Sequence, residues 1–230
     1  MKCALIAVLL AGTMTGMHCS GQSLSTARSS QFPRFRLRAG QVDADGLPTS
    51  GAKLCLLAQQ NICYQMPSET YPNSAVTYQF GLEPRSERLT LVDGGSWVFF
   101  SAMFSGGGSG TLTRLAVLRY EGGGKFGQVV NPIPWVGATN VSDWAMWNVP
   151  SASAYPVFIH ADFIWGDGET HFAPHFYTVE AWKFDPGTDR YTKAFDYKTG
   201  RKYAGGDDGP VRVLEPEREQ IVSRLESKHE

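Results

Sequence analysis

The sequence predicts an all-β protein with mostly antiparallel sheets and a single C-terminal helix. Short apolar runs that alternate with polar residues recur along the chain and are separated by Gly, Asp and Pro turns, the pattern of half-buried strands. Two stretches, 98–104 and 157–163, are almost continuously apolar, as expected of strands buried on both faces. Apolar residues make up 42% of the chain, which is enough for a sizeable core. We therefore expect one β domain over residues 34–230.

The first 27 residues are interpreted as a secretory signal peptide. Lys2 supplies a positive start, residues 3–12 form a short apolar run, and small residues allow cleavage after Gly21 or Ala27. The run is too short to span a bilayer, and no longer apolar run follows it. We expect a secreted or periplasmic protein without a membrane span. Lipidation of Cys19 is less favoured, because the residues before it are not small.

The charge balance argues against a nucleic-acid partner. The chain has 21 Lys and Arg residues against 22 Asp and Glu residues, and its formal net charge is −1. A phosphate-binding surface requires a basic excess or patch, and the basic residues are scattered along the sequence.

Cleavage of the signal peptide leaves two cysteines, Cys55 and Cys63. An even pair in an exported chain predicts a disulfide. The segment 55–63, CLLAQQNIC, suits a hairpin whose antiparallel strands place the two cysteines opposite each other. Two buried thiols are the alternative.

The remaining elements follow from local patterns. Residues 28–33 are polar and predict a disordered start, and residues 34–39 then alternate Arg with apolar residues, as in a strand with one face in water. Further strands are expected at 53–58, 62–66, 76–80, 88–92, 96–104, 112–120, 125–130, 155–161, 177–184, 190–195 and 211–214. A helix is expected near 216–227, because Pro216 suits a first helical position and an apolar stripe at helical spacing follows it.

An internal repeat relates two parts of the chain. Residues 98–104 (VFFSAMF) align with 157–163 (VFIHADF), and the loop 107–110 (GGSG) aligns with 166–169 (GDGE). Each copy continues with a strand, a Gly-containing turn and another strand, at an offset within the range of repeat arrays.

The two units, near 96–131 and 155–198, resemble β-propeller blades of the FG-GAP or VCBS kind. The resemblance covers residues 96–198, and the first copy lacks the acidic loop residues of those families. It implies a small propeller. A two-sheet sandwich built on the duplicated unit accounts for the pattern equally well.

The second copy carries a group of polar residues around its loop: His160, Asp162, Asp167, Glu169, His171 and His175. Asp162, Asp167 and Glu169 bring oxygen donors to a glycine-bearing loop, which suits calcium. Zinc prefers histidine with carboxylate, but His171 and His175 would lie roughly 13 Å apart on a straight strand, so zinc is the weaker candidate. A solvated acidic turn with locally hydrogen-bonded histidines explains the same residues without a metal.

Two functions fit this loop. The leading hypothesis is a non-enzymatic protein that binds a carbohydrate or a protein through the loops after the two buried strands. Trp165, beside Gly166 in the predicted loop, is the best candidate for an exposed stacking surface, with His160, His171 and His175 beside it. The alternative is a metal-dependent or carboxylate-dependent hydrolase, in which Glu169 would pair with Asp162 or Asp167 as acid and base.

Overall fold

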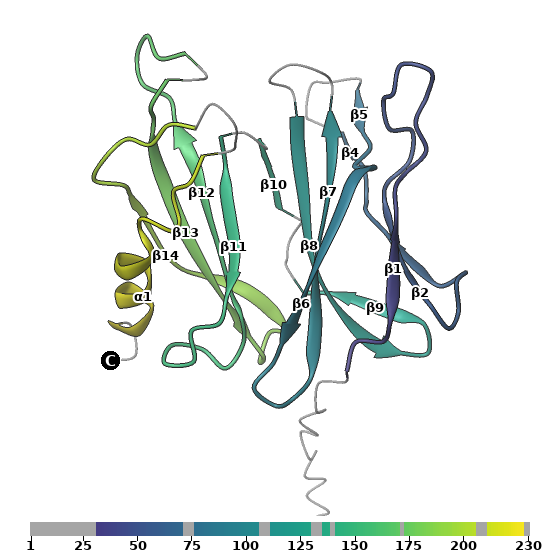
Figure 1. Cartoon of the computed structure of the whole chain (residues 1–230). Helices are drawn as coiled ribbons and strands as arrows, with labels where there is room; N and C mark the ends of the chain where they lie inside the picture. The colour runs from purple at the N-terminus through teal and green to yellow at the C-terminus, as the bar shows by residue number, and fades with distance from the viewer. Residues whose placement is uncertain are drawn as a thin grey trace, which may run out of the picture.

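A computed structural model of the chain describes residues 31–70, 76–105, 111–129, 135–138, 141–170, 173–205 and 211–227. The expected signal peptide and His171 lie outside the described residues. Within them, the protein consists of antiparallel sheets and a single helix, α1 (Arg218–Glu226), near the C-terminus (Figure 1). This architecture confirms the predicted fold class. No helix in the described part of the chain has the length and hydropathy of a membrane span.

The strands form three main sheets and one short ribbon. The first sheet has the order β1 (Phe35–Arg38), β2 (Lys53–Leu56), β3 (Cys63–Gln65). The second has the order β10 (Trp135–Ala138), β8 (Thr111–Gly122), β7 (Ser96–Ser105), β6 (Leu82–Thr90), and β9 (Lys125–Gln128) also pairs with β8. The third has the order β11 (Asp143–Trp147), β12 (Val157–Ile164), β13 (Phe176–Asp185), β14 (Arg190–Lys198). The ribbon pairs β4 (Glu69–Thr70) with β5 (Thr77–Tyr78).

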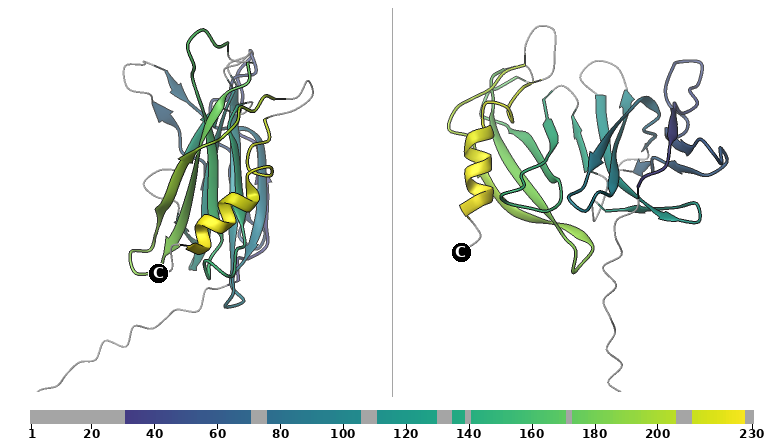
Figure 2. Two further views of the ribbon diagram at one scale, coloured as in Figure 1. Left: turned by 90° about the vertical axis from the view of Figure 1, so that its left-hand side faces the viewer. Right: turned by 60° about the horizontal axis from the view of Figure 1, so that its bottom comes forward.

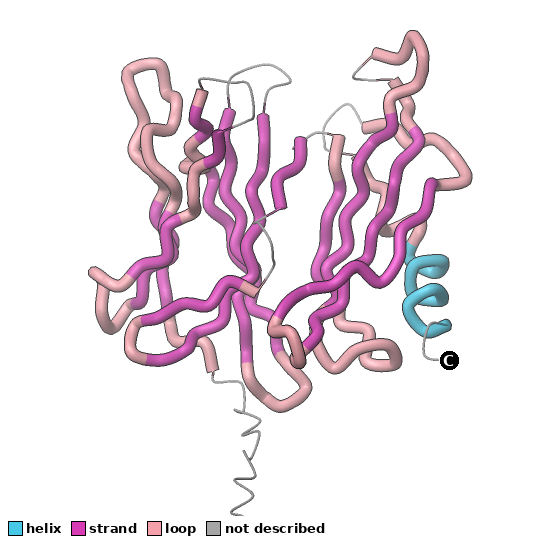
Figure 3. Tube along the Cα trace, turned by 180° about the vertical axis from the view of Figure 1, so that it is seen from behind, coloured by secondary structure: helices cyan, strands magenta, loops and turns pink. Residues whose placement is uncertain are grey.

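The three main sheets and the helix stack as successive layers (Figures 1 and 3). One apolar cluster lies between the first sheet and the second, a further cluster between the second and the third, and the last between the third sheet and α1. The helix covers the outer side of the third sheet, as the rotated view shows (Figure 2). The stack has one sheet more than a two-sheet sandwich.

The position of β7 between two layers explains why its sequence is continuously apolar. Val98 and Phe100 belong to the cluster shared with the first sheet, whereas Trp97 belongs to the cluster shared with the third sheet. Successive side chains of a strand point to opposite faces, so both faces of β7 are buried. Strand β12 repeats this arrangement, with Ile159 packed toward α1 and Phe158 toward the second sheet.

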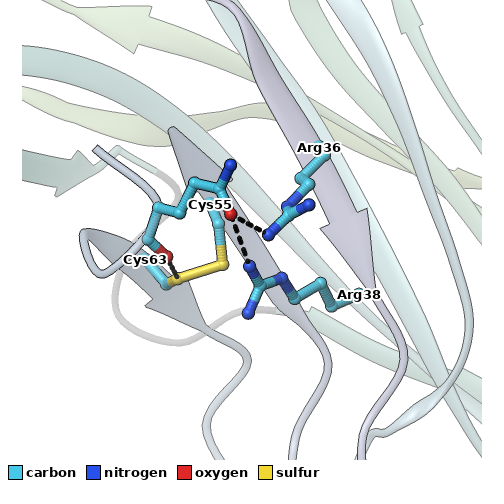
Figure 4. Close-up of a disulfide and its surroundings, with 5 residues drawn as sticks. Arg36, Arg38, Cys55 and Cys63 are labelled. Carbon is cyan, nitrogen blue, oxygen red and sulfur yellow. Dashed lines mark hydrogen bonds between the residues drawn. A yellow bond between two sulfur atoms is a disulfide. The ribbon is translucent and has the colours of Figure 1, made fainter. Parts of the chain in front are cut away.

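The expected hairpin and disulfide are confirmed. Cys55 and Cys63 occupy directly opposite positions of β2 and β3, and a disulfide joins them with a Cα–Cα distance of 4.0 Å (Figure 4). On β1, Phe35 and Leu37 pack against the inner cluster. The intervening arginines therefore face outward, as the alternation predicted.

The expected disordered start is wrong at its C-terminal end. Phe32 is buried and contacts the rings of Phe35 and Phe126, with centroid separations of 5.6 and 6.0 Å. Its backbone N–H donates to Ser96 Oγ at 2.8 Å. An aromatic residue in a polar segment supplies apolar area for the core, and this outweighs the polar composition around it.

The C-terminal segment also differs from its expected form. Residues 211–214 lie outside any strand, because the N–H groups of Val213 and Leu214 donate to the side-chain carboxylate of Asp143 at 2.7 and 2.8 Å. The helix begins after Glu217, whose carboxylate accepts hydrogen bonds from the hydroxyls of Tyr197 and Tyr203. These contacts fix the helix on the third sheet.

Removal of a ring from the layer between the second and third sheets tests this packing. Phe158 is buried in that layer, so Phe158→Ala should lower the free energy of unfolding by about 3–5 kcal/mol. Val92 is 75% exposed, and Val92→Ala should change it by no more than about 0.5 kcal/mol. Urea denaturation measures both, and equal effects would contradict the layer assignment.

The disulfide closes a short loop, with a sequence separation of 8 residues. Replacing both cysteines by alanine should lower the free energy of unfolding by about 2–3 kcal/mol, because the unfolded chain gains entropy. Chemical reduction should lower the free energy of unfolding of the wild-type protein by the same amount. It should not change the free energy of unfolding of the double variant. A reduced protein that unfolds at the same urea concentration as the oxidised protein would refute this expectation.

Candidate functional site

The third sheet divides the predicted site residues between its two faces. His160 and Asp162 lie on the face of β12 that also carries Phe158, which packs toward the second sheet. Phe163 lies on the opposite face, and its ring contacts the imidazole of His175 at a centroid distance of 5.1 Å. Of the polar residues that the sequence groups around this loop, His160 and Asp162 therefore lie on one face and Glu169, which contacts His175, on the other, because consecutive strand residues point to opposite sides. A single site of His160, Asp162, Glu169 and His171 on one face does not fit this arrangement, and His171 lies outside the described residues.

The first group, which we term the Trp165 cluster, consists of Phe163, Trp165, Glu169, His175 and Lys202. β12 ends at Ile164, and Gly168 has a positive φ of 71°, a conformation that glycine adopts without strain. This turn brings the Glu169 carboxylate back to accept a hydrogen bond from the N–H of Gly166 at 2.9 Å.

The carboxylate of Glu169 connects the loop to two later segments. Its Oε2 atom lies 2.7 Å from His175 Nδ1, and its Oε1 atom contacts the ammonium group of Lys202. The backbone of His175 exchanges hydrogen bonds of 2.9 and 2.8 Å with that of Tyr203, which places Lys202 beside the loop. Sequence reasoning missed Lys202, since no local pattern links it to a loop more than thirty residues earlier.

Three rings of the Trp165 cluster contact one another. The ring of Trp165 lies 5.0 Å from that of Phe163 and 5.4 Å from that of His175, measured between centroids, with interplanar angles of 72° and 74°. These edge-to-face contacts are favourable arrangements for aromatic pairs. Trp165 nevertheless remains 56% exposed, so the structure confirms its predicted exposure and fixes its orientation.

The electrostatics of the Trp165 cluster keep Glu169 ionised. Hydrogen bonds from Lys202, from His175 and from the backbone of Gly166 lower the pKa of Glu169 to about 2. Each of these donors stabilises the charged form of the carboxylate. The carboxylate is thus a negative charge at neutral pH, beside an exposed lysine and in contact with His175, whose ring contacts Trp165.

The second group lies on the other face and forms a row across the sheet. Across strands β11 to β14, Trp144 lies opposite His160, His160 lies opposite Glu180, and Glu180 lies opposite Asp196. His160 Nε2 lies 2.9 Å from Glu180 Oε2, and Lys193 contacts both Glu180 and Asp196 at 3.0 and 2.8 Å.

Charge complementarity stabilises this row. Burial of the His160 ring opposes its protonation, but the neighbouring Asp162 and Glu180 outweigh burial and raise the pKa of His160 above its usual value. His160, followed by Lys193, in turn lowers the pKa of Glu180 to about 2 against the effect of burial. Ser142 Oγ donates to Asp162 at 2.8 Å. The row is thus a network that links β12, β13 and β14 and reaches Ser142, directly before β11.

The proposed metal ligands do not come together. Asp162 contacts Ser142 and His160 on one face, Glu169 is engaged by Lys202 and His175 on the other, and Asp167 is exposed in the turn. Within the described residues, no three His, Cys, Asp or Glu side chains are grouped so as to hold a metal ion. The geometry therefore gives no support to a calcium set of Asp162, Asp167 and Glu169, and His171 of the zinc alternative lies outside the described residues.

Comparisons with known proteins add little to this picture. No protein-family model matches the chain, and no curated protein sequence matches it. Among solved structures, the chain is similar to the crystal structure of CarG, with 15% sequence identity and a TM-score of 0.39, over 62% of this chain and 92% of that chain. A likeness of that degree carries no argument about the site.

The lowered pKa of Glu169 predicts how stability depends on pH. A carboxyl group whose folded pKa lies below its unfolded value stabilises the fold at higher pH, and this contribution is lost as pH falls. The wild-type melting temperature should drop between about pH 4.5 and pH 2. Glu169→Gln should lower the melting temperature at pH 7 and reduce that further drop.

The neighbouring exposed acid provides the control. Asp167→Asn should leave both the melting temperature at pH 7 and the acid profile unchanged, because Asp167 is exposed in the turn. Thermal unfolding followed by circular dichroism across this pH range measures the three proteins. Identical profiles for Glu169→Gln and the wild type would show that the carboxylate does not connect the loop as described.

Proposed function

We propose that the protein is a non-enzymatic binding protein that engages a carbohydrate through the loop after β12, with Trp165 as the stacking surface. The observation that supports this most directly is the exposure of Trp165 on a constrained support. Phe163 and His175 contact its ring, and Glu169 fixes His175. A preoriented aromatic side chain loses little entropy when a ligand binds.

A carbohydrate suits the chemistry around Trp165. A sugar ring presents a face of C–H groups, which packs on an indole, and hydroxyl groups at its edge, which need polar partners. Lys202 supplies an exposed donor at the edge of the Trp165 cluster. Lys198 lies nearby on β14, with its ammonium 4.4 Å from the centroid of the Phe176 ring, which Lys202 also contacts at 5.5 Å.

The same geometry favours binding over hydrolysis. A glycosidase requires one carboxyl group to donate a proton and a second within reach on the other side of the scissile bond. Glu169 is ionised at neutral pH, because its pKa is about 2, and Asp162 lies on the opposite face of the sheet. The pairing of Glu169 with Asp162 therefore does not suit a glycosidase, and this supports a binding role for the loop.

We also propose that the protein is exported and that its second and third sheets arose by duplication. The Cys55–Cys63 disulfide supports export, since such bonds persist in oxidising compartments. Support for duplication comes from strand order, because β6–β7–β8–β9 and β11–β12–β13–β14 are paired in the same succession. The copy that carries the Trp165 cluster would then be the specialised one.

Binding through Trp165 is tested by removing its ring. The wild type is first screened by affinity electrophoresis against a panel of neutral polysaccharides. Trp165→Ala should not be retarded by the polysaccharide that retards the wild type. Its melting temperature should change little, since more than half of the side chain is exposed. Val92→Ala, which shortens another exposed apolar side chain, should bind like the wild type.

Fluorescence provides an independent readout. The bound polysaccharide should reduce acrylamide quenching of the wild type but not of Trp165→Ala. If no polysaccharide retards the wild type, or if Trp165→Ala is retarded equally, carbohydrate binding at this loop is refuted.

A further inference from the structure

The outer face of the first sheet concentrates positive charge. Arg36 and Arg38 alternate with Phe35 and Leu37, which pack inward, and Arg34 continues the same alternation, since its carbonyl accepts from the N–H of Leu57 in the extended ladder. Lys53 lies directly opposite Arg38 on β2. We term this set, Arg34, Arg36, Arg38 and Lys53, the basic face.

The fold does not neutralise these charges. Within the described residues, no ion pair includes a member of the basic face, and the strands β1, β2 and β3 contain no acidic residue. Arg36 and Arg38 instead donate to one neutral acceptor, the amide oxygen of Gln60, the latter at 3.4 Å (Figure 4). Like charges on opposed strand positions disfavour folding, so the basic face is electrostatically unfavourable in the isolated protein.

The basic face is also preorganised. Arg36 pairs with Cys55, and Cys55 pairs with Cys63, so the disulfide crosses the sheet beside the arginines. The same disulfide closes the hairpin that carries Gln60, whose backbone carbonyl oxygen lies 3.5 Å from Cys63 Sγ. A clamped hairpin holds two guanidinium groups side by side before any partner arrives, which reduces the entropic cost of binding.

We propose that the basic face binds a linear anionic polysaccharide. Alternate residues of a strand are about 6.7 Å apart, so Arg34, Arg36 and Arg38 form a row about 13 Å long. Guanidinium groups present paired donors that match carboxylate and sulfate oxygens. A hollow of about 590 Å³ lies at the Arg34 end of the row, at the edge of the first sheet beside β8, and its lining includes Pro33, Arg34, Leu56, Leu57, Gln59 and Tyr120.

The row and the disulfide favour a polysaccharide over other polyanions. A membrane presents a plane of headgroups and is bound most strongly when apolar side chains are buried in it beside a basic patch, whereas these arginines follow one strand. The Cys55–Cys63 bond is typical of oxidising compartments, where nucleic acid is not the usual partner. The basic face lies on the first sheet, so this proposal does not depend on the Trp165 cluster.

Two charge-matched variants of the full chain test the proposal. Arg34→Gln/Arg38→Gln removes two cations of the basic face, and Arg85→Gln/Arg212→Gln removes two exposed arginines elsewhere. Binding to heparin and to polygalacturonate is measured by surface plasmon resonance at two salt concentrations, with dextran as the neutral reference. Vesicles rich in phosphatidylglycerol and a DNA oligonucleotide are measured beside them.

The wild type should bind both anionic polysaccharides, more weakly at the higher salt concentration, and its response to dextran should be the same as that of the basic-face variant. The basic-face variant should bind about tenfold more weakly, the ratio that two exposed ion pairs supply, whereas the control variant should bind within about twofold of the wild type. Circular dichroism establishes that each variant is folded. If the double variant does not fold, Arg38→Gln against Arg85→Gln makes the same comparison.

Three outcomes would overturn the proposal. Equal losses in the two variants would indicate a general charge effect, and unchanged binding in the basic-face variant would place the polysaccharide elsewhere. Tighter binding to vesicles or to DNA than to either polysaccharide would assign the face to a different partner.

Discussion

Burial of the second sheet on both faces is the constraint on which the rest of the structure depends. β7 and β8 carry large apolar side chains on each side, with Phe100 and Leu118 on one face and Trp97 and Leu115 on the other. Each face needs a covering layer, because exposed apolar area of that size is unfavourable in water. The first and third sheets provide these layers. The third sheet is apolar on its far face as well, and α1 covers it with Ile221 and Leu225.

Side-chain carboxylates hold in place the irregular segments that lie outside the sheets. Asp143 accepts hydrogen bonds from the backbone N–H groups of residues 213 and 214. Glu217, at the start of α1, accepts hydrogen bonds from the hydroxyls of two tyrosines. Glu169 connects the loop after β12 to His175 and Lys202. Charged acceptors form stronger hydrogen bonds than neutral ones. The orientation of Trp165 thus depends on Glu169, although the two side chains play different roles in the proposed site.

The two proposed binding surfaces lie on different layers of the stack and differ in chemistry. The Trp165 cluster belongs to the third sheet and offers an aromatic face with its internal charges paired. The basic face belongs to the first sheet and offers cations that have no carboxylate partner among the described residues. The substitutions that test one surface therefore leave the other unchanged.

The sequence by itself predicted most of the strands, the disulfide and the exposure of Trp165, because each follows from local rules. It did not predict β4, β10 or β11, and the strand expected at 211–214 is absent. Alternation of Arg with Phe and Leu identified β1, continuous apolar runs identified β7 and β12, and the short spacing of Cys55 and Cys63 favoured pairing across a hairpin. Only the tertiary structure decided which side chains meet. The alternation of side chains along β12 places His160 and Asp162 on the face opposite Phe163. The backbone bridge between His175 and Tyr203 brings Lys202 next to Glu169. Pairing of β1 with β2 places Lys53 opposite Arg38. These contacts arise from strand pairing and sheet stacking, which join residues distant in sequence, and no local pattern records that pairing.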